Sequence, residues 1–202
     1  DQLRSDLAEV GLSTIPAGWR FVSVDVPLAP ERGPEGLQGH TIRDLGGGYV
    51  GVGSSFGYQS VHETVLDTAA QRRVLGDLGG WIPRTPNTGV PVSEGAGQYR
   101  AIGRVLTLSQ LRRINTELQR AWVDLNSPTA RTEMQTATKA ILGDHVDFDP
   151  AQPPLVLVVS SMAGGAGASM ALDVCRSLAS IQGVDLGLVA VFMVGADAFS
   201  YL

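Results

Sequence analysis

Apolar positions at helical spacing divide much of the chain into amphipathic stretches. The clearest local signals surround one of them, because the pair Ser127-Pro128 is typical of a helix start and Gly143 of a helix end. Along the whole chain the spacing predicts helices over residues 1–10, 60–75, 107–126, 128–143 and 170–182.

Two of these helices carry a further start signal. Ser60 with Glu63, and Thr107 with Gln110, have the spacing of a capping box. In a capping box the first side chain accepts a backbone N–H of the first turn, and the second side chain bonds back to the start. We therefore expect helices to begin at Ser60 and at Thr107.

Other stretches have the pattern of strands. Val22, Val24 and Val26 alternate with polar residues and predict a strand that ends near Asp25. A short edge strand is expected over residues 49–52, within a region that is otherwise rich in glycine.

The last part of the chain reads as strand, helix and strand. Residues 155–159 form a continuous apolar run, which is expected of a strand covered on both faces. Residues 186–194 form a second such run, and a helix lies between them. Strands joined in this way are parallel, with a right-handed connection. The sequence therefore predicts an α/β protein with a Rossmann-like parallel sheet flanked by helices.

Two long segments rich in glycine and proline, residues 27–58 and 81–104, separate these elements. Loops of this length are unusual in a compact domain, and we expect them to be binding or mobile segments. A single domain over residues 1–202 is expected. Because the chain begins at Asp1 without a methionine, we expect a fragment of a longer protein.

Composition narrows the class of protein. With 44% hydrophobic and 17% charged residues the chain is globular in type, and its net charge of −5 gives no footprint for nucleic acid. The longest apolar run is too short to cross a bilayer. A single cysteine, Cys175, excludes an internal disulfide and fits a reducing cytoplasm. The histidines His40, His62 and His145 lack partners at ligand spacing, so no side-chain metal site is expected.

The candidate chemistry lies in a turn over residues 160–169, between the last two predicted strands. The carboxyl end of a parallel strand is where open α/β sheets bind ligands, and the helix that follows offers unpaired N–H groups to an anion. Glycines permit close approach to the backbone, and serines add hydroxyl groups. The residues concerned are Gly164, Gly165, Gly167, Ser160, Ser161 and Ser169.

This turn is not a P-loop. A P-loop needs a lysine directly after its second glycine to reach the phosphates. Here Ala168 and Ser169 follow Gly167, and Lys139 is the only lysine of the chain.

A dinucleotide-binding fingerprint fits the turn in part. Gly165 and Gly167 match its first two glycines, and Asp197 after the next strand could hold a ribose. The third glycine, however, would fall at Met170, where helix and strand must pack closely. An NAD(P)-binding oxidoreductase domain therefore stays as the third alternative.

Two stretches taken together resemble a known family. "AGGAGAS", residues 163–169, resembles the tubulin/FtsZ signature, and "EGAGQYRAIGR", residues 94–104, resembles the loop and helix start that precede it. The phrase "VVSSMAGGAGASMALDV" is most similar to the divergent bacterial tubulin-like proteins. The order of strand, acid, loop and turns over residues 20–200 also agrees.

The resemblance implies a partial tubulin/FtsZ-type nucleotide-binding domain, cytoplasmic and acting in a homo- or hetero-oligomer. Its ligand would be GTP or GDP, accompanied by Mg²⁺. Asp25 would correspond to the acid near the phosphates or their magnesium, and Asp197 would meet the ribose. The residues that would cradle the phosphates are Gly164, Gly165, Ala166, Gly167, Ala168 and Ser169, and those approaching the γ-phosphate are Ala96, Gly97 and Gln98.

The chain also departs from the family pattern. Ala166 replaces the signature threonine, and Ser169 replaces the closing glycine. The family's first glycine loop, its base-reading helix and its water-activating acidic loop find no match. The first function expected is a GTP-binding switch or assembly protein, with GTPase activity in the full assembly. The alternative is a structural or interaction subunit that keeps the fold and has lost nucleotide turnover.

Overall fold

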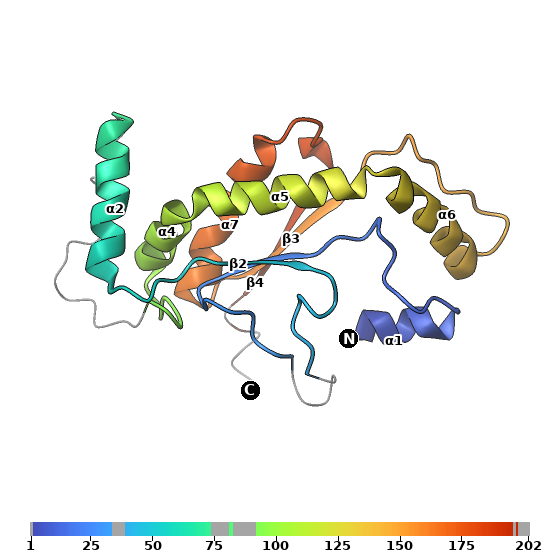
Figure 1. Cartoon of the computed structure of the whole chain (residues 1–202), viewed down its shortest axis with the longest axis horizontal. Coiled ribbons are helices and arrows are strands. Elements are labelled where there is room, and N and C mark those ends of the chain that lie inside the picture. The colour runs from blue at the N-terminus through green and yellow to red at the C-terminus, as the bar shows by residue number, and fades with distance from the viewer. Residues whose placement is uncertain (1, 34–38, 74–80, 83–91, 196, 198–202) are drawn as a thin grey trace. The chain divides into compact units, whose positions relative to one another are not determined.

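The computed structural model describes residues 2–33, 39–73, 81–82, 92–195 and 197, and Figure 1 shows its ribbon. Its helices and short parallel strands confirm the α/β class. In chain order the elements are α1 (Gln2–Glu9), β1 (Val22–Asp25), β2 (Gly48–Gly51), α2 (Tyr58–Gln71), α4 (Arg100–Ser109), α5 (Leu111–Leu125), α6 (Pro128–Leu142), β3 (Val156–Ser161), α7 (Gly165–Ala179), a 3-10 turn (Leu186–Leu188) and β4 (Val189–Val194).

The chain divides into two compact units, and the division passes through β1, β2 and α5. The helices α1 and α6 belong to the first unit, whereas α2, α4, α7, β3 and β4 belong to the second. The first unit comprises Asp1–Ser23, Pro30–Tyr49 and Thr116–Pro154, and the second comprises Val24–Ala29, Val50–Asn115 and Leu155–Leu202.

Local signals set the ends of α6 in the first unit. Ser127 is the N-cap, and its Oγ accepts the Ala130 N–H at 3.2 Å, with Pro128 at the first helical position. Gly143 ends the helix at φ +88°. The prediction for this helix is confirmed at both ends, because the signals that set them are local in sequence.

The strands β1 and β2 pair with each other. The pairing continues past their ends, where Val52 N–H donates to Asp25 O at 2.8 Å and Gly53 N–H to Val26 O at 2.9 Å. The predicted strand ending at Asp25 is confirmed. The predicted edge strand is found one residue earlier than expected.

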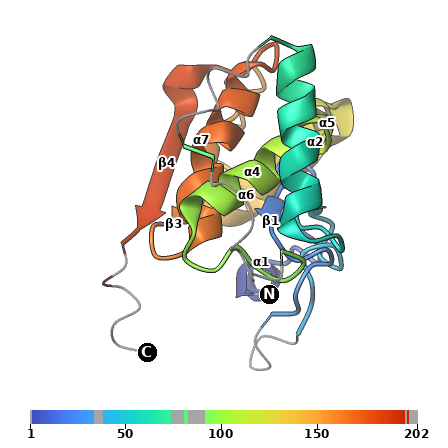
Figure 2. The same ribbon diagram turned by 90° about the vertical axis from the view of Figure 1, so that its left-hand side faces the viewer.

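The second unit contains the predicted strand–helix–strand motif, but with other bounds. α7 begins at Gly165, within the segment predicted as a turn, and residues 186–188 of the predicted second strand form a 3-10 turn. β3 pairs in parallel with β4, from Val156 opposite Val189 to Ser161 opposite Val194. α7 connects the two strands and packs on β3 and on α4, and Figures 1 and 2 show α4 and α7 side by side. α2 packs on α4 in turn. This arrangement places the start of α7 at the carboxyl end of β3.

The capping box predicted at Ser60 and Glu63 is wrong. α2 begins two residues before Ser60, with Gly57 as its N-cap and no side-chain cap. Glu63 instead accepts Nε2–H of Gln59 at 2.9 Å, within the helix. The first helical residue, Tyr58, is buried. Packing of this ring favours a helix that begins earlier in the chain, at Tyr58, and the local pattern did not predict it.

The capping box predicted at Thr107 and Gln110 is also wrong. Thr107 lies inside α4 and is fully buried, and its Oγ1 donates to Gly103 O at 2.9 Å. α4 begins at Arg100, so residues 100–104 of the loop predicted over residues 81–104 are helical, and the helix is interrupted at Gln110 before α5 begins. The end of α2 differs as well. It closes at Gln71, and residues 74–80 lie outside the described part.

The expectation that the strand at residues 155–159 is covered on both faces is wrong. Leu155, Leu157 and Val159 are 63%, 56% and 69% exposed, and Phe192 of β4, opposite Val159, is 54% exposed. The other face of β3 packs on α7. A continuous apolar run does not reveal what covers each face, and in the described residues one face stays open.

Candidate functional site

The glycine turn leads from β3 into the first turn of α7. Gly164 is the N-cap, with φ −106° and ψ 164°, and no side chain caps the helix. The first N–H groups of a helix have no acceptor inside it. The N–H groups of Ala166 and Gly167 also have no acceptor outside the helix in the described part of the chain. The helix start therefore presents two unpaired donors at the positive end of the helix dipole.

A second turn closes against this helix start. Gly97 has φ +54°, and its carbonyl accepts the Gly165 N–H at 2.9 Å. A Cβ on Gly165 would lie 2.8 Å from both Gly97 O and Tyr99 N, so only glycine allows this approach. The structure thus brings together the segments over residues 96–98 and 164–169, named below the 96–98 turn and the 164–169 turn.

The three glycines of the 164–169 turn have different reasons to be glycine. A Cβ on Gly167 would lie 2.8 Å from Ser161 O and 3.1 Å from Ser160 Oγ, so packing of the chain excludes a side chain at this position. Gly165 is fixed by the neighbouring turn, as above. Gly164 has nothing within 4 Å of the Cβ position and an ordinary φ. Neither packing nor backbone conformation requires glycine at Gly164, and the space beside the unpaired N–H groups is open.

The hydroxyl groups of the turn are engaged with its own backbone. Ser160 and Ser169 donate to carbonyl oxygens of the turn at 2.9 and 2.7 Å. Ser161 Oγ accepts the N–H of Ala163 at 3.1 Å. Ala166 supplies no hydroxyl at all. An anion at this turn would therefore depend on backbone N–H groups.

Two arginines of α4 lie differently with respect to the turn. Arg100 is exposed, and its Nη2 donates to Met162 O at 3.4 Å, which places the guanidinium beside the 164–169 turn. Arg104, one helical turn later, pairs through Nε with Asp173 of α7 at 3.2 Å. Arg100 is therefore the better placed of the two to meet a phosphate.

The two acids of the predicted site lie at strand ends. Asp25 closes β1 and is exposed, and its Oδ1 accepts the N–H of Val26 at 2.7 Å. No hydrogen bond or ion pair joins Asp25 to either turn in the described part of the chain. Asp197 is exposed beyond β4, between positions that lie outside the described residues.

Sequence reasoning missed Asp173. This carboxylate is buried on the face of α7 that also buries Met170 and Leu178, and besides Arg104 it accepts Nη1–H of Arg176 at 2.9 Å. The available signal was an acidic residue one helical turn from Ser169 and from Ser177, within a helix that buries Met170 and Leu178. Such a residue requires a buried partner.

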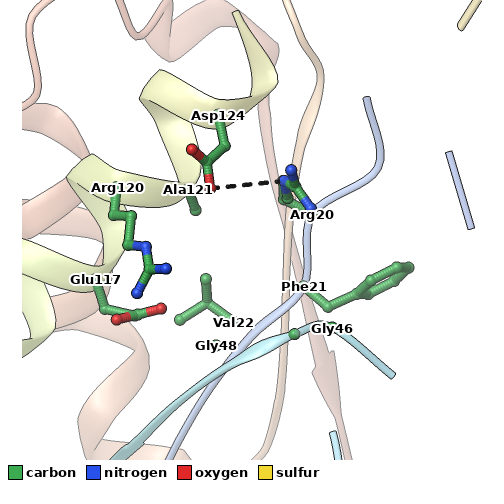
Figure 3. Close-up of a pocket in the computed structure, with 10 residues that line it drawn as sticks. Arg20, Phe21, Val22, Gly46, Gly48, Glu117, Arg120, Ala121 and Asp124 are labelled. Carbon is green, nitrogen blue, oxygen red and sulfur yellow. Dashed lines mark ion pairs between the residues drawn. The ribbon is translucent and has the colours of Figure 1, made fainter. Parts of the chain in front are cut away.

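A separate polar pocket of about 100 Å³ lies within the first unit (Figure 3). Arg20 and Asp124 form an ion pair across it at 3.9 Å, and Glu117 and Arg120 of α5 line it as well. Two arginines and two carboxylates balance in charge, so this pocket has no net attraction for an anion. Gly46 and Gly47 of the loop before β2, and Gly48 at the start of β2, complete its wall.

The described residues contain no group of three His, Cys, Asp or Glu side chains that could hold a metal ion. A magnesium ion beside Asp25 would therefore need phosphate and water oxygens as its remaining ligands, and this ligand set is common for Mg²⁺ in proteins. Burial raises the pKa of the Cys175 thiol, which lowers the fraction of reactive thiolate. No helix of the described chain has the length and apolar character to cross a membrane.

Comparison with known protein families gives a match. The family model described as "Tubulin like" matches residues 1–201. No curated protein and no solved structure matches the chain. The family match spans both turns of the candidate site.

Proposed function

Because the chain belongs to the tubulin-like family, we propose that it binds GTP or GDP with the phosphates against the 164–169 turn. One observation carries the proposal. The two unpaired N–H groups at the start of α7 lie where the 96–98 turn is hydrogen-bonded to the same helix start, and Gly164 leaves the space beside them open. A phosphate can approach these N–H groups closely because Gly164 has no side chain in its way.

The second turn and one arginine support the same reading. The 96–98 turn lies against the start of α7 through the Gly97–Gly165 hydrogen bond, so a terminal phosphate would meet both turns. In the absence of a lysine, Arg100 would supply the positive charge, from the place where it bonds Met162 O. Asp25 would bind the magnesium that accompanies the phosphates, and Asp197 would meet the ribose.

A second candidate function is favoured by Ala166. The family hydroxyl is missing there, and the serine hydroxyls of the turn are engaged with backbone carbonyls. A structural or interaction subunit that binds nucleotide weakly, or not at all, would fit this loss. The dinucleotide alternative is less well supported, because Met170 is buried at the position where its third glycine should stand.

Calorimetry with GTP, GDP and NAD on the wild-type chain and on Gly164→Asp tests the proposal. Asp at this N-cap would accept from the free N–H groups and interact favourably with the helix dipole, by about 0.3–1 kcal/mol. The same carboxylate would compete with phosphate for two charge-assisted bonds of about 1.5–3 kcal/mol each. We expect unchanged or raised stability and at least about a 100-fold loss of GTP affinity.

The matched control is Gly57→Asp at the start of α2. Gly57 is also an N-cap with open space around its Cβ position and no side-chain cap. This variant adds the same charge to the same kind of helix end, and GTP affinity should not change. Wild type that binds neither GTP nor GDP would overturn the proposal in favour of the structural subunit. Binding of NAD alone would favour the oxidoreductase domain.

A further inference from the structure

The start of α4, together with the 96–98 turn before it, meets α7 at three contacts, named here the α4–α7 seam. At its first end Gly97 O accepts the Gly165 N–H at 2.9 Å. Next, a Cβ on Gly103 would lie 2.5 Å from both Gly165 O and Ser169 Oγ, so glycine lets α4 approach the first turn of α7 closely. Finally, Arg104 Nε donates to Asp173 Oδ2 at 3.2 Å. The seam therefore runs from the candidate site to a buried ion pair.

The ion pair differs from an ordinary surface pair. The Asp173 side chain is 4% exposed and is held from two sides, by Arg104 of α4 and by Arg176 of its own helix at 2.9 Å. The Arg104 guanidinium also stacks on the Trp81 ring, 4.4 Å from its centroid. Arg176 is 59% exposed and lies three residues along the same helix. Of the two arginines, only Arg104 links one helix to the other.

The other contacts of the seam lie at its first end. Glycine at Gly103 and Gly165 lets the backbones approach closely there, whereas the far end is joined through Arg104 and Asp173. A buried ion pair adds little stability over an apolar pair of the same volume, yet it is directional and accepts one arrangement. Sliding of α4 by even a fraction of a helical turn would separate Arg104 from Asp173.

We propose that Arg104 and Asp173 are positioning residues, which fix the axial register of α4 against α7 and thereby hold the 96–98 turn over the 164–169 turn. They act through the Gly97–Gly165 hydrogen bond and do not touch the ligand. This inference rests on the proposed function for the ligand, but the register that it describes is a property of the chain without nucleotide.

Amide hydrogen exchange and GTP calorimetry on the whole chain test this proposal. The Gly165 N–H reports the first contact of the seam, and the Leu178 N–H reports α7 near its other end. In Arg104→Gln we expect Gly165 to exchange at least about tenfold faster and Leu178 to keep its rate. GTP affinity should fall by about tenfold, because the two turns are no longer pre-organised. Asp173→Asn should behave in the same way while keeping the side-chain size.

Two controls separate positioning from general stability. Arg176→Gln removes the other cation that pairs with Asp173, which lies on the same helix, α7. Both the exchange rates and the GTP affinity should remain those of wild type. Arg104→Lys keeps the charge and should restore most of the Gly165 protection. Wild-type exchange at Gly165 in both Arg104→Gln and Asp173→Asn would overturn the proposal. Equal acceleration of Gly165 and Leu178 would also overturn it. A wild-type chain that binds no GTP would refute the proposed function, while exchange at Gly165 would still decide the register.

Discussion

The helices α2 and α7 begin alike and differ in what surrounds their first turn. Each starts from a glycine N-cap, Gly57 or Gly164, with no side-chain cap and with open space at the Cβ position. In α2 the first helical residue is Tyr58, which is buried, and burial raises the pKa of its hydroxyl to about 12. In α7 the first helical residue is Gly165, which meets the carbonyl of Gly97.

The difference shows that an uncapped helix start is not by itself a binding site. Both helices begin with N–H groups that have no acceptor inside the helix, and both have a dipole. In α7 a second turn is hydrogen-bonded to the first helical residue, and the guanidinium of Arg100 lies beside the same turn. The convergence of separate chain segments distinguishes the candidate site from an ordinary helix end.

The largest effect is expected from valine at the third helical residue, which is Gly167 in α7 and Ser60 in α2. In Gly167→Val the side chain would run into Ser161 O and Ser160 Oγ, and the overpacking should lower the free energy of unfolding by about 3 kcal/mol. Nucleotide binding should be lost with the shape of the turn. Urea unfolding followed by tryptophan fluorescence, together with calorimetry, measures both changes.

Ser60→Val is the matched variant, because Ser60 is exposed at the same position of α2. Its free energy of unfolding should change by less than about 1 kcal/mol, and GTP affinity should stay that of wild type. Equal stability of the two variants would mean that the end of β3 yields to a side chain, and that Gly167 is not required by packing.

Much of the fold could be predicted wherever the signal is local. Ser127, Pro128 and Gly143 set both ends of α6 from neighbouring residues alone. The glycine turn between two apolar runs was predicted for the same reason. The capping boxes at Ser60 and Thr107 had equally good local spacing. Both predictions failed because of burial. Tyr58 is buried as the first residue of α2, so Ser60 lies inside that helix, and Thr107 is itself buried inside α4.

The candidate site was predictable as two segments but not as an arrangement. Sequence spacing and family resemblance pointed to Gly97 and Gly165, but the hydrogen bond between them joins residues far apart in the chain. The partner of Asp173 is Arg104, equally distant, and a one-dimensional pattern carries no information on that pairing. The open face of β3 was missed because an apolar run does not show what packs on it.

A gain of GTP affinity is expected when Ala166, the second helical residue of α7, is replaced by a residue with a hydroxyl group. Ala166→Thr restores the group of the tubulin pattern beside the free N–H groups, where a bond to phosphate would contribute about 1.5–3 kcal/mol. GTP should then bind about tenfold more tightly or better, as measured by calorimetry. Ala166→Val has nearly the same shape without the hydroxyl and should show no gain. An equal gain in both variants would assign the effect to packing of the β-branched side chain.

The smallest effect is expected at Ser169, although it belongs to the same turn. Its Oγ donates to Gly165 O at 2.7 Å and to Ala166 O at 3.0 Å, and the residue is buried, so the hydroxyl is not aimed at a ligand. Ser169→Ala loses one internal hydrogen bond of about 1 kcal/mol and gains helix propensity, so stability should change by less than about 1 kcal/mol.

GTP affinity of Ser169→Ala should stay within about twofold of wild type, because phosphate is held by backbone N–H groups and not by this hydroxyl. Thr64→Ala is the counterpart in α2, where Oγ1 also donates to the carbonyl four residues earlier, that of Ser60, at 2.9 Å but at an exposed position. It should change neither stability nor affinity measurably. A tenfold loss of GTP affinity in Ser169→Ala alone would mean that the serine turns toward the phosphate on binding. In that case the hydroxyl lost at Ala166 would be compensated one helical turn later.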